Sequence, residues 1–374
     1  MAESSPEKQR LSQPSTEELT QRERLLDIDE FVLEVGQFGL YQKLITFVYC
    51  LLILAPVYQT MVMAFVGFSP TWKCSKSGLL TGSCNMTEEI TSDHVHFDKR
   101  CNLNRSHWQF TKDTKFSIVT EFDLVCSMTP VYLFCSAAVY LGWAIGAIIL
   151  GWVSDRFGRK TVLFPSYAGI LLIGFVSSFS PNIWFFMIMR LIIGFFLAGI
   201  VLNLFVLAAE LVGPKYRAFA GTTIWFFFTA SLALVGLQAY FIPDWRMLLK
   251  IMTAPYIILL VFWKFVPESL RWLRVNDKTD QAEQVLEKVA KYNKVPFPPG
   301  AKILPARKDM SESSMADLFT PRPMLISTLL QNFIWFINGK YLIHANIDSI
   351  IYERGPLRGA RNPAFTQVFC TNHA

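Results

Sequence analysis

The stretch GWVSDRFGRK, Gly151 to Lys160, ends an apolar run that starts at Pro130, and its last six residues include an aspartate, two arginines and a lysine. A second apolar run begins at Thr161. Gly158 supplies the backbone freedom that a reversal of chain direction requires. The stretch therefore predicts a tight, charged turn between two long apolar helices.

Apolar runs of this kind recur along the chain. Of its 374 residues, 52% are apolar and 14% are aromatic, which is unusual for a soluble protein. A stretch of about 18 apolar residues can cross the hydrocarbon core of a bilayer as a helix. We count seven such stretches, at Leu44–Val66, Pro130–Val153, Thr161–Phe179, Ile183–Ala209, Ala218–Ile242, Met247–Val266 and Met324–Ala345. Their number and length do not fit the buried helices of a soluble core, so we predict an all-α membrane protein in contact with the lipid bilayer.

The charges of the loops predict the orientation in the membrane. Residues 1–43 are polar and contain no apolar core of a signal peptide, so we expect a cytosolic N-terminal tail and an uncleaved first helix. Cytosolic loops are enriched in Lys and Arg. The turn after the second helix carries Arg156, Arg159 and Lys160, and the turn after the fourth carries Lys215 and Arg217. A seven-helix receptor would have the reverse orientation, with its amino terminus outside.

The long segment 67–129 between the first two helices has features of an extracellular loop. It contains the sequons NMT at Asn85 and NRS at Asn104, which predict N-glycosylation. It also contains an even number of cysteines, which predicts disulfides in an oxidising compartment. These are Cys74, Cys84, Cys101 and Cys126, and the sequence leaves their three possible pairings open. Cys50 and Cys135 lie within apolar runs and are interpreted as packing residues.

Close helix packing is expected for the helices at Pro130–Val153 and Ala218–Ile242. Gly142 and Gly146 form a step of two small residues four positions apart, which lets helix backbones approach closely in lipid.

The opening stretch also resembles a known signature. The positive-inside rule does not account for Asp155, but a glycine four residues before an aspartate in such a turn resembles the signature of the major facilitator superfamily of secondary transporters. Four further stretches resemble its organic cation, organic anion and carnitine transporter family, which is also called solute carrier 22-like. They are LEVGQFGLYQ at Leu33–Gln42, SIVTEFDLVC at Ser117–Cys126, ELVGPKYR at Glu210–Arg217 and VPESLRWL at Val266–Leu273.

This resemblance extends over about residues 27–345 and implies a fold. The family has twelve helices in two six-helix halves. We therefore expect the N-terminal six-helix half plus one helix of the second half, with the chain truncated after the seventh helix. Residues 267–323 are expected to form a cytosolic loop with short helices, because an amphipathic stripe runs through 277–293. Residues 346–374 are a divergent tail.

The resemblance also implies a function and a set of charged residues. Family members transport small organic cations, anions or zwitterions such as carnitine by alternating access, and we expect a plasma-membrane location. Arg190 resembles part of a general superfamily motif in the fourth helix. The expected gating and charge network consists of Gly151, Asp155, Arg156, Gly158, Arg159, Lys160, Arg190, Glu210, Arg217, Glu268 and Arg271.

Polar and aromatic side chains within the helices are the candidates for contact with a solute. They are Tyr58, Gln59, Asn203, Trp225, Phe228 and Trp335. Tyr341 follows Trp335 by six residues instead of the seven of the family pattern, which puts it off the expected face. The sequence shows no phosphate-binding glycine loop, metal-ligand cluster or nucleophile motif, so no catalytic residue, metal or cofactor is predicted, and nucleic acid is not an expected partner.

An alternative function remains open at this point. The same residues also fit a non-transporting membrane fragment or a regulatory isoform that associates with a full-length relative.

Overall fold

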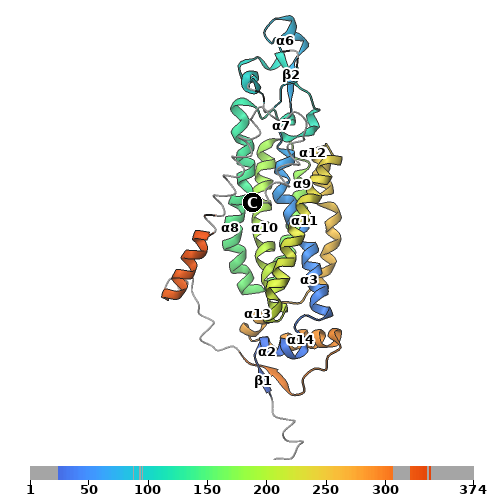
Figure 1. Cartoon of the computed structure of the whole chain (residues 1–374), viewed down its shortest axis with the longest axis vertical. Coiled ribbons are helices and arrows are strands. Elements are labelled where there is room, and N and C mark those ends of the chain that lie inside the picture. Colours follow the sequence, from blue (N-terminus) through green and yellow to red (C-terminus); the bar gives the residue numbers. More distant parts are fainter. Residues whose placement is uncertain are drawn as a thin grey trace, which may run out of the picture.

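Long helices standing side by side form the body of the molecule (Figure 1). The computed structural model describes residues 24–86, 88–91, 94, 96–305, 321–334 and 337. Within this part of the chain, six helical stretches are long and apolar enough to cross a membrane, which confirms the first six predicted spans. They are Leu40–Val66, Cys126–Phe157, Arg159–Ser177, Ile183–Leu211, Pro214–Phe241 and Trp245–Lys264. Of the predicted seventh span, residues 324–334 belong to a helix over 322–334, Ile337 is also helical, and the rest, Trp335 included, lies outside the described residues.

The first and sixth spans are interrupted, although the sequence predicts continuous helices. The first consists of α3 (Leu40–Leu52), α4 (Leu54–Met61) and α5 (Met63–Val66), and it begins four residues before the predicted start. The sixth consists of α12 (Trp245–Ile251) and a 3-10 helix, η6 (Ala254–Lys264). Pro255 stands at the start of η6. Because proline lacks a backbone N–H and clashes with the preceding turn, it ends the α-helical ladder there.

The closest helix packing lies between α8 (Thr129–Phe157) and α10 (Ile183–Leu211). A Cβ atom on Gly142 would lie 2.0 Å from the carbonyl oxygen of Leu191, and one on Gly146 would lie 2.3 Å from that of Phe195. The two backbones therefore touch where only glycine fits. On the fifth helix, α11 (Arg217–Phe241), the small residues Ala220 and Ser231 are buried, whereas a Cβ on Gly221 would meet open space, so the small-residue packing predicted for this helix does not involve Gly221.

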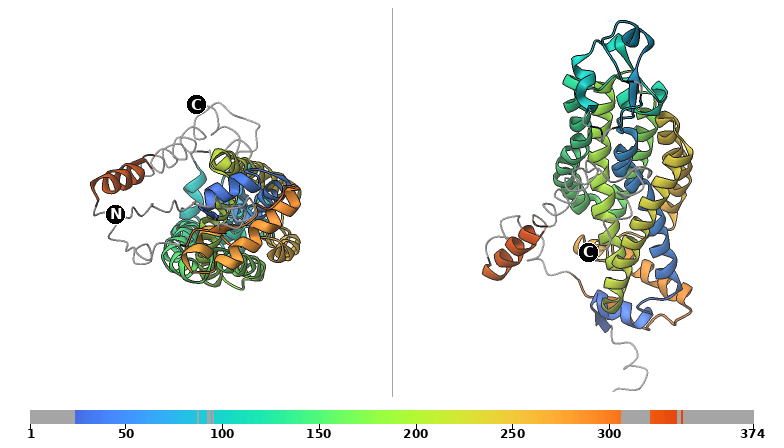
Figure 2. Two further views of the ribbon diagram at one scale, coloured as in Figure 1. Left: turned by 90° about the horizontal axis from the view of Figure 1, so that it is seen from below. Right: turned by 45° about the horizontal axis from the view of Figure 1, so that its top comes forward.

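Short elements from both ends of the described chain cover the lower end of the bundle (Figures 1 and 2). Strand β1 (Arg24–Leu26) pairs in parallel with β4 (Ala301–Ile303). Helix α2 (Ile28–Val35) packs beside α14 (Thr279–Asn293), and the Asn293 amide donates to the carbonyl oxygen of Val35 at 3.1 Å. The predicted N-terminal tail is therefore folded from Arg24 onward.

The upper end carries the segment between the first two spans. Strands β2 (Trp72–Cys74) and β3 (Trp108–Phe110) pair antiparallel, and the remaining elements are short helices. These are α6 (Lys76–Leu80), η1 (Phe97–Asn102), η2 (Arg105–His107), η3 (Thr114–Phe116), α7 (Ile118–Glu121) and η4 (Cys126–Met128). The structure joins Cys74 to Cys84 and Cys101 to Cys126. Asn85 and Asn104 are both exposed.

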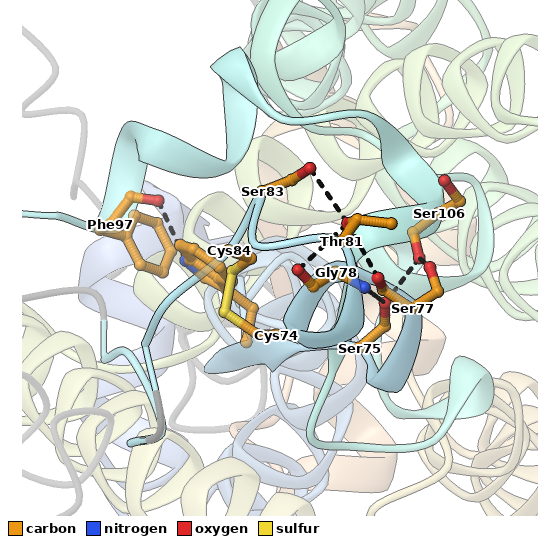
Figure 3. Close-up of a disulfide and its surroundings, with 10 residues drawn as sticks. Cys74, Ser75, Ser77, Gly78, Thr81, Ser83, Cys84, Phe97 and Ser106 are labelled. Atoms are coloured by element: carbon orange, nitrogen blue, oxygen red, sulfur yellow. Dashed lines mark hydrogen bonds between the residues drawn. A yellow bond between two sulfur atoms is a disulfide. The ribbon is translucent and has the colours of Figure 1, made fainter.

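The Cys74–Cys84 disulfide encloses helix α6 (Figure 3). The Ser75 hydroxyl accepts a hydrogen bond from the backbone N–H of Gly78 at 3.2 Å and donates to the carbonyl oxygen of Ser106 at 2.6 Å. A Cβ on Gly78 would lie 2.3 Å from the carbonyl oxygen of His107, so α6 packs directly against the chain that precedes β3.

One arginine joins this upper segment to the bundle. The Arg246 guanidinium lies 2.6 Å from the Glu121 carboxylate and donates to the carbonyl oxygens of Ser178 and Ser180, both at 2.8 Å. The Trp245 indole N–H also donates to Glu121, at 2.6 Å. We call these five residues the upper clamp, because they connect α7, the turn between α9 (Arg159–Ser177) and α10, and the start of α12.

Candidate functional site

The turn of the opening stretch is a single glycine at the lower end of the bundle. Helix α8 ends at Phe157 and α9 (Arg159–Ser177) begins at Arg159, with Gly158 between them at φ +112°. This backbone conformation favours glycine. A Cβ at Gly158 would lie 2.4 Å from Oε2 of Glu268, so the Glu268 carboxylate packs directly on the turn.

Glu268 ties this turn to the segment after the sixth span. One of its carboxylate oxygens accepts hydrogen bonds from the backbone N–H groups of Lys160 and Ser269, both at 2.9 Å. The Ser269 hydroxyl donates to the Glu210 carboxylate at the end of α10. The structure thus brings Gly158, Lys160, Glu210 and Glu268 together.

Asp155 and Arg159 form the second part of this charge network. Their side chains lie 2.6 Å apart, and Arg159 also donates to the Ser154 hydroxyl at 3.1 Å. The indole N–H of Trp272, on α13 (Leu270–Val275), donates to the backbone carbonyl of Asp155 at 2.7 Å. The Asp155 carboxylate is 66% exposed, so it is free to engage a further partner.

Two aspartates just before and within α2 complete the network, and sequence reasoning missed them. Asp29 contacts both Arg217 and Arg271, and Asp27 contacts Arg274. Burial acts to raise the pKa of Asp27, but the hydrogen bond and positive charge of Arg274 outweigh it and lower that pKa below its ordinary value. The start of α2 could have been predicted from the sequence, because Asp27 and Glu30 form a capping box ahead of its apolar positions.

Three residues predicted for the network stand outside it. A Cβ on Gly151 would have no neighbour within 4 Å. The Arg156 guanidinium lies 5.5 Å from the ring centre of Trp152, on its own helix. Arg190 is fully buried in the bundle and contacts Gln59.

The predicted solute contacts fall into separate groups. Trp225 and Phe228 are neighbours on α11, with ring centres 5.2 Å apart, and Trp225 is 51% exposed. Tyr58 is fully buried and accepts a hydrogen bond from the Tyr256 hydroxyl at 2.9 Å. Asn203 is buried and accepts a hydrogen bond from Ser154, next to the lower charge network. Trp335 lies outside the described residues.

The chemistry of the network suits contacts that form and separate reversibly. Its ion pairs are partly exposed, and each such pair contributes about 0.2–1 kcal/mol. Among the described residues, no group of three or more His, Cys, Asp or Glu side chains is placed to hold a metal ion.

Comparison with known proteins identifies relatives over most of the chain. The family model described as sugar (and other) transporter matches residues 45–338. An organic cation transporter protein of Drosophila melanogaster is 30% identical over 83% of this chain and 63% of its own length. Organic cation/carnitine transporter 4 of Arabidopsis thaliana is 32% identical over 77% of this chain and 52% of its own length. The chain thus spans between about half and two thirds of the length of these curated relatives.

A solved structure also matches. The xylose transporter XylE from E. coli, in a partially occluded inward-open conformation, has 22% sequence identity and a TM-score of 0.48, and the match covers 68% of this chain and 56% of that one.

The family match covers well over half of the chain and includes five of its six membrane-length helices in full and most of the first. The chain is therefore a multi-pass membrane protein that belongs to the sugar (and other) transporter family of the major facilitator superfamily.

Proposed function

We propose that this chain provides the N-terminal half of a secondary transporter that moves small organic ions across a membrane by alternating access. One observation supports the proposal. The Gly158 turn is held by Glu268, and the exposed carboxylate of Asp155, three residues before the turn, pairs with Arg159 directly after it. A rocking transporter requires contacts at one end of the bundle that form and break in each cycle. The names of the curated relatives support organic ions as the solute class.

The lower end is proposed to face the cytosol, in the plasma membrane. Basic side chains gather there, including Arg159, Arg217 and Arg271, in accordance with the positive-inside rule. The opposite end carries both disulfides, which form in oxidising compartments. Glycosidase treatment is expected to shift the gel mobility of the wild type but not of an Asn85→Gln, Asn104→Gln double variant. A wild type without any shift would remove the support from glycosylation.

The exposed Trp225 and its partly buried neighbour Phe228 are proposed to contribute to the solute cavity. Aromatic faces attract cationic groups, with about 2 kcal/mol when the cation is desolvated. The side chains of Tyr58, Gln59 and Asn203 are buried between helices. We therefore propose that they support the residues that form the cavity wall.

The test of this function measures uptake in cells. We expect saturable uptake of an organic ion by a chimera that joins this chain to the second half of a curated relative. Asp155→Asn is expected to reduce that uptake at least tenfold at unchanged surface expression, because the neutral amide loses its ion pair with Arg159. Asp123→Asn is the matched control, since Asp123 forms an exposed pair with Arg105 at the other end of the molecule. Full uptake by the Asp155 variant would contradict a role in gating.

A further inference from the structure

Arg190 is a charged side chain in the apolar part of the bundle. It is 0% exposed and lies seven residues after Ile183, where α10 begins. At 1.5 Å per residue, this places it about 10 Å along the helix from its upper end. Ionisable groups at such depth are expensive, and they are usually paired or functional.

Among the described residues, the hydrogen bonds of Arg190 all go to one neutral residue. One terminal nitrogen donates to the Gln59 side-chain oxygen at 3.3 Å, and the other donates to the Gln59 backbone carbonyl. In the part of the chain that the structure describes, neither Nε of Arg190 nor Nε2 of Gln59 has a hydrogen-bond partner. Two adjacent buried groups are therefore left with free N–H donors.

No carboxylate of the described helices is available to balance this charge. Within the six membrane-length stretches, the acidic residues are Asp155 and Glu210. Glu210 follows Arg190 by 20 residues on the same helix, which is about 30 Å along its axis. Asp155 is paired with Arg159 at the lower end.

Glu121, in the upper clamp, is already bound by Arg246. An isolated guanidinium in a low-dielectric interior requires a negative partner or water to offset its desolvation.

We propose that Arg190 and Gln59 form a binding site for a small anionic group, either a halide ion or the carboxylate of an organic solute. The free donors are N–H groups, and no acidic side chain contacts them among the described residues, so the site attracts anions and repels cations. Gly174 faces the Gln59 amide, and a Cβ there would lie 2.6 Å from Nε2. Because Gly174 has no side chain, the amide group of Gln59 can pack directly against α9.

The site can be tested on the 374-residue chain itself, without transport. The purified protein is heated in sodium chloride, sodium acetate or sodium methanesulfonate at matched ionic strength, and the unfolding midpoint is measured as each anion is titrated. A ligand at about ten times its Kd is expected to raise the midpoint by about 2 °C, with saturation. Saturation by chloride alone assigns a halide site, and saturation by acetate assigns a carboxylate site. An equal, non-saturating response to all three salts would overturn the proposal.

Two variants locate the response. Gln59→Glu places a carboxylate within reach of Arg190, so it should raise the midpoint in methanesulfonate and abolish the anion-specific rise. Arg105→Gln, in an exposed pair far from α10, should keep the full response. A saturable response that survives in the Gln59 variant, or one that disappears in the Arg105 variant, would show that the anion binds elsewhere. Because stability is measured, failure of this site and failure of the transport proposal are distinguishable.

Discussion

The two ends of the helix bundle are held together by different kinds of interaction. At the upper end, two disulfides lie within the segment over the bundle, and the upper clamp joins that segment to the α9–α10 connection and to the start of α12. At the lower end, the corresponding contacts are ion pairs and hydrogen bonds among short elements. The side chains of Arg246 and Glu121 are 23% and 25% exposed, whereas those of the lower ion pairs range from 21% for Arg274 to 66% for Asp155, so at least one partner of each lower pair is more exposed than the clamp.

This difference separates a fixed end from an end that can rearrange. Partly buried, multiply bonded charges are costly to separate, because each leaves an unpaired partner behind. Exposed pairs separate at a cost of about 0.2–1 kcal/mol each, because water replaces the partner. We therefore expect the upper segment to move with the bundle as one body, while the lower contacts change.

The largest expected effect comes from removing a covalent link at the upper end. The Cys101–Cys126 disulfide closes a loop with a sequence separation of 25 residues. A Cys101→Ser, Cys126→Ser variant is expected to lose about 3 kcal/mol of stability in the upper segment, because the reduced chain gains loop entropy on unfolding. Faster limited proteolysis of residues 97–126, with the helices still protected, would measure it. Unchanged proteolysis would show that the clamp alone holds the segment.

The next effect tests the clamp itself. Glu121→Gln removes the negative charge beneath Arg246 and Trp245, and it should lower the free energy of unfolding by about 2–3 kcal/mol. Asp123→Asn, which disrupts the exposed pair with Arg105, is the control and should cost less than about 1 kcal/mol. Thermal unfolding in detergent compares the two. Equal effects would contradict the contrast between the two ends.

A smaller effect is expected at the Gly158 turn of the lower end. Gly158→Ala forces a side chain into a φ of +112° and against Glu268, which should cost about 1–2 kcal/mol. Gly151→Ala, on the same helix end, meets open space and should be neutral or slightly stabilising. Unfolding midpoints of the two alanine variants measure the difference, and a neutral Gly158 variant would mean that the turn relaxes freely.

The smallest effect concerns pH. The pKa of Asp27 is lowered in the folded protein, so its stabilising contribution is present above the unfolded pKa and is lost as the pH falls through the folded value. Between pH 6 and strongly acidic pH, the wild type should therefore lose slightly more stability than Asp27→Asn. Parallel pH dependences of the two unfolding midpoints would show that Arg274 contributes nothing through Asp27.

The features that could be predicted from the sequence are those that depend on residues close together along the chain. Apolar runs identified the six spans, and Gly158 with its charged neighbours identified the lower turn. Other features depend on partners that are distant in the sequence. Helix α2 has eight residues, too few for a span, and it is held by Asn293 and Arg274 from the far end of the described chain. The pairing of Cys74 with Cys84 and of Cys101 with Cys126 likewise depends on how the whole upper segment folds, which the spacing of the cysteines does not reveal.

The candidate site was predicted only in part for the same reason. A motif indicates which residues carry charge, but the partner of each charge is set by packing. Asp29, which lies between Arg217 and Arg271, was found from the structure, and so was the contact of Arg190 with Gln59, which the sequence had marked as a candidate solute contact.

The pairing of β1 with β4 has a consequence for how the protein is made. Leu26 lies opposite Ile303, so 277 further residues must be synthesised after Leu26 before the two can meet. At about 5–20 residues per second, that takes roughly 15–55 seconds. The first strand therefore emerges from the ribosome long before its partner exists, and six hydrophobic helices are inserted in the interval. The pairing can close only after the last of those helices has been delivered, which makes it a late step in the biogenesis of the chain.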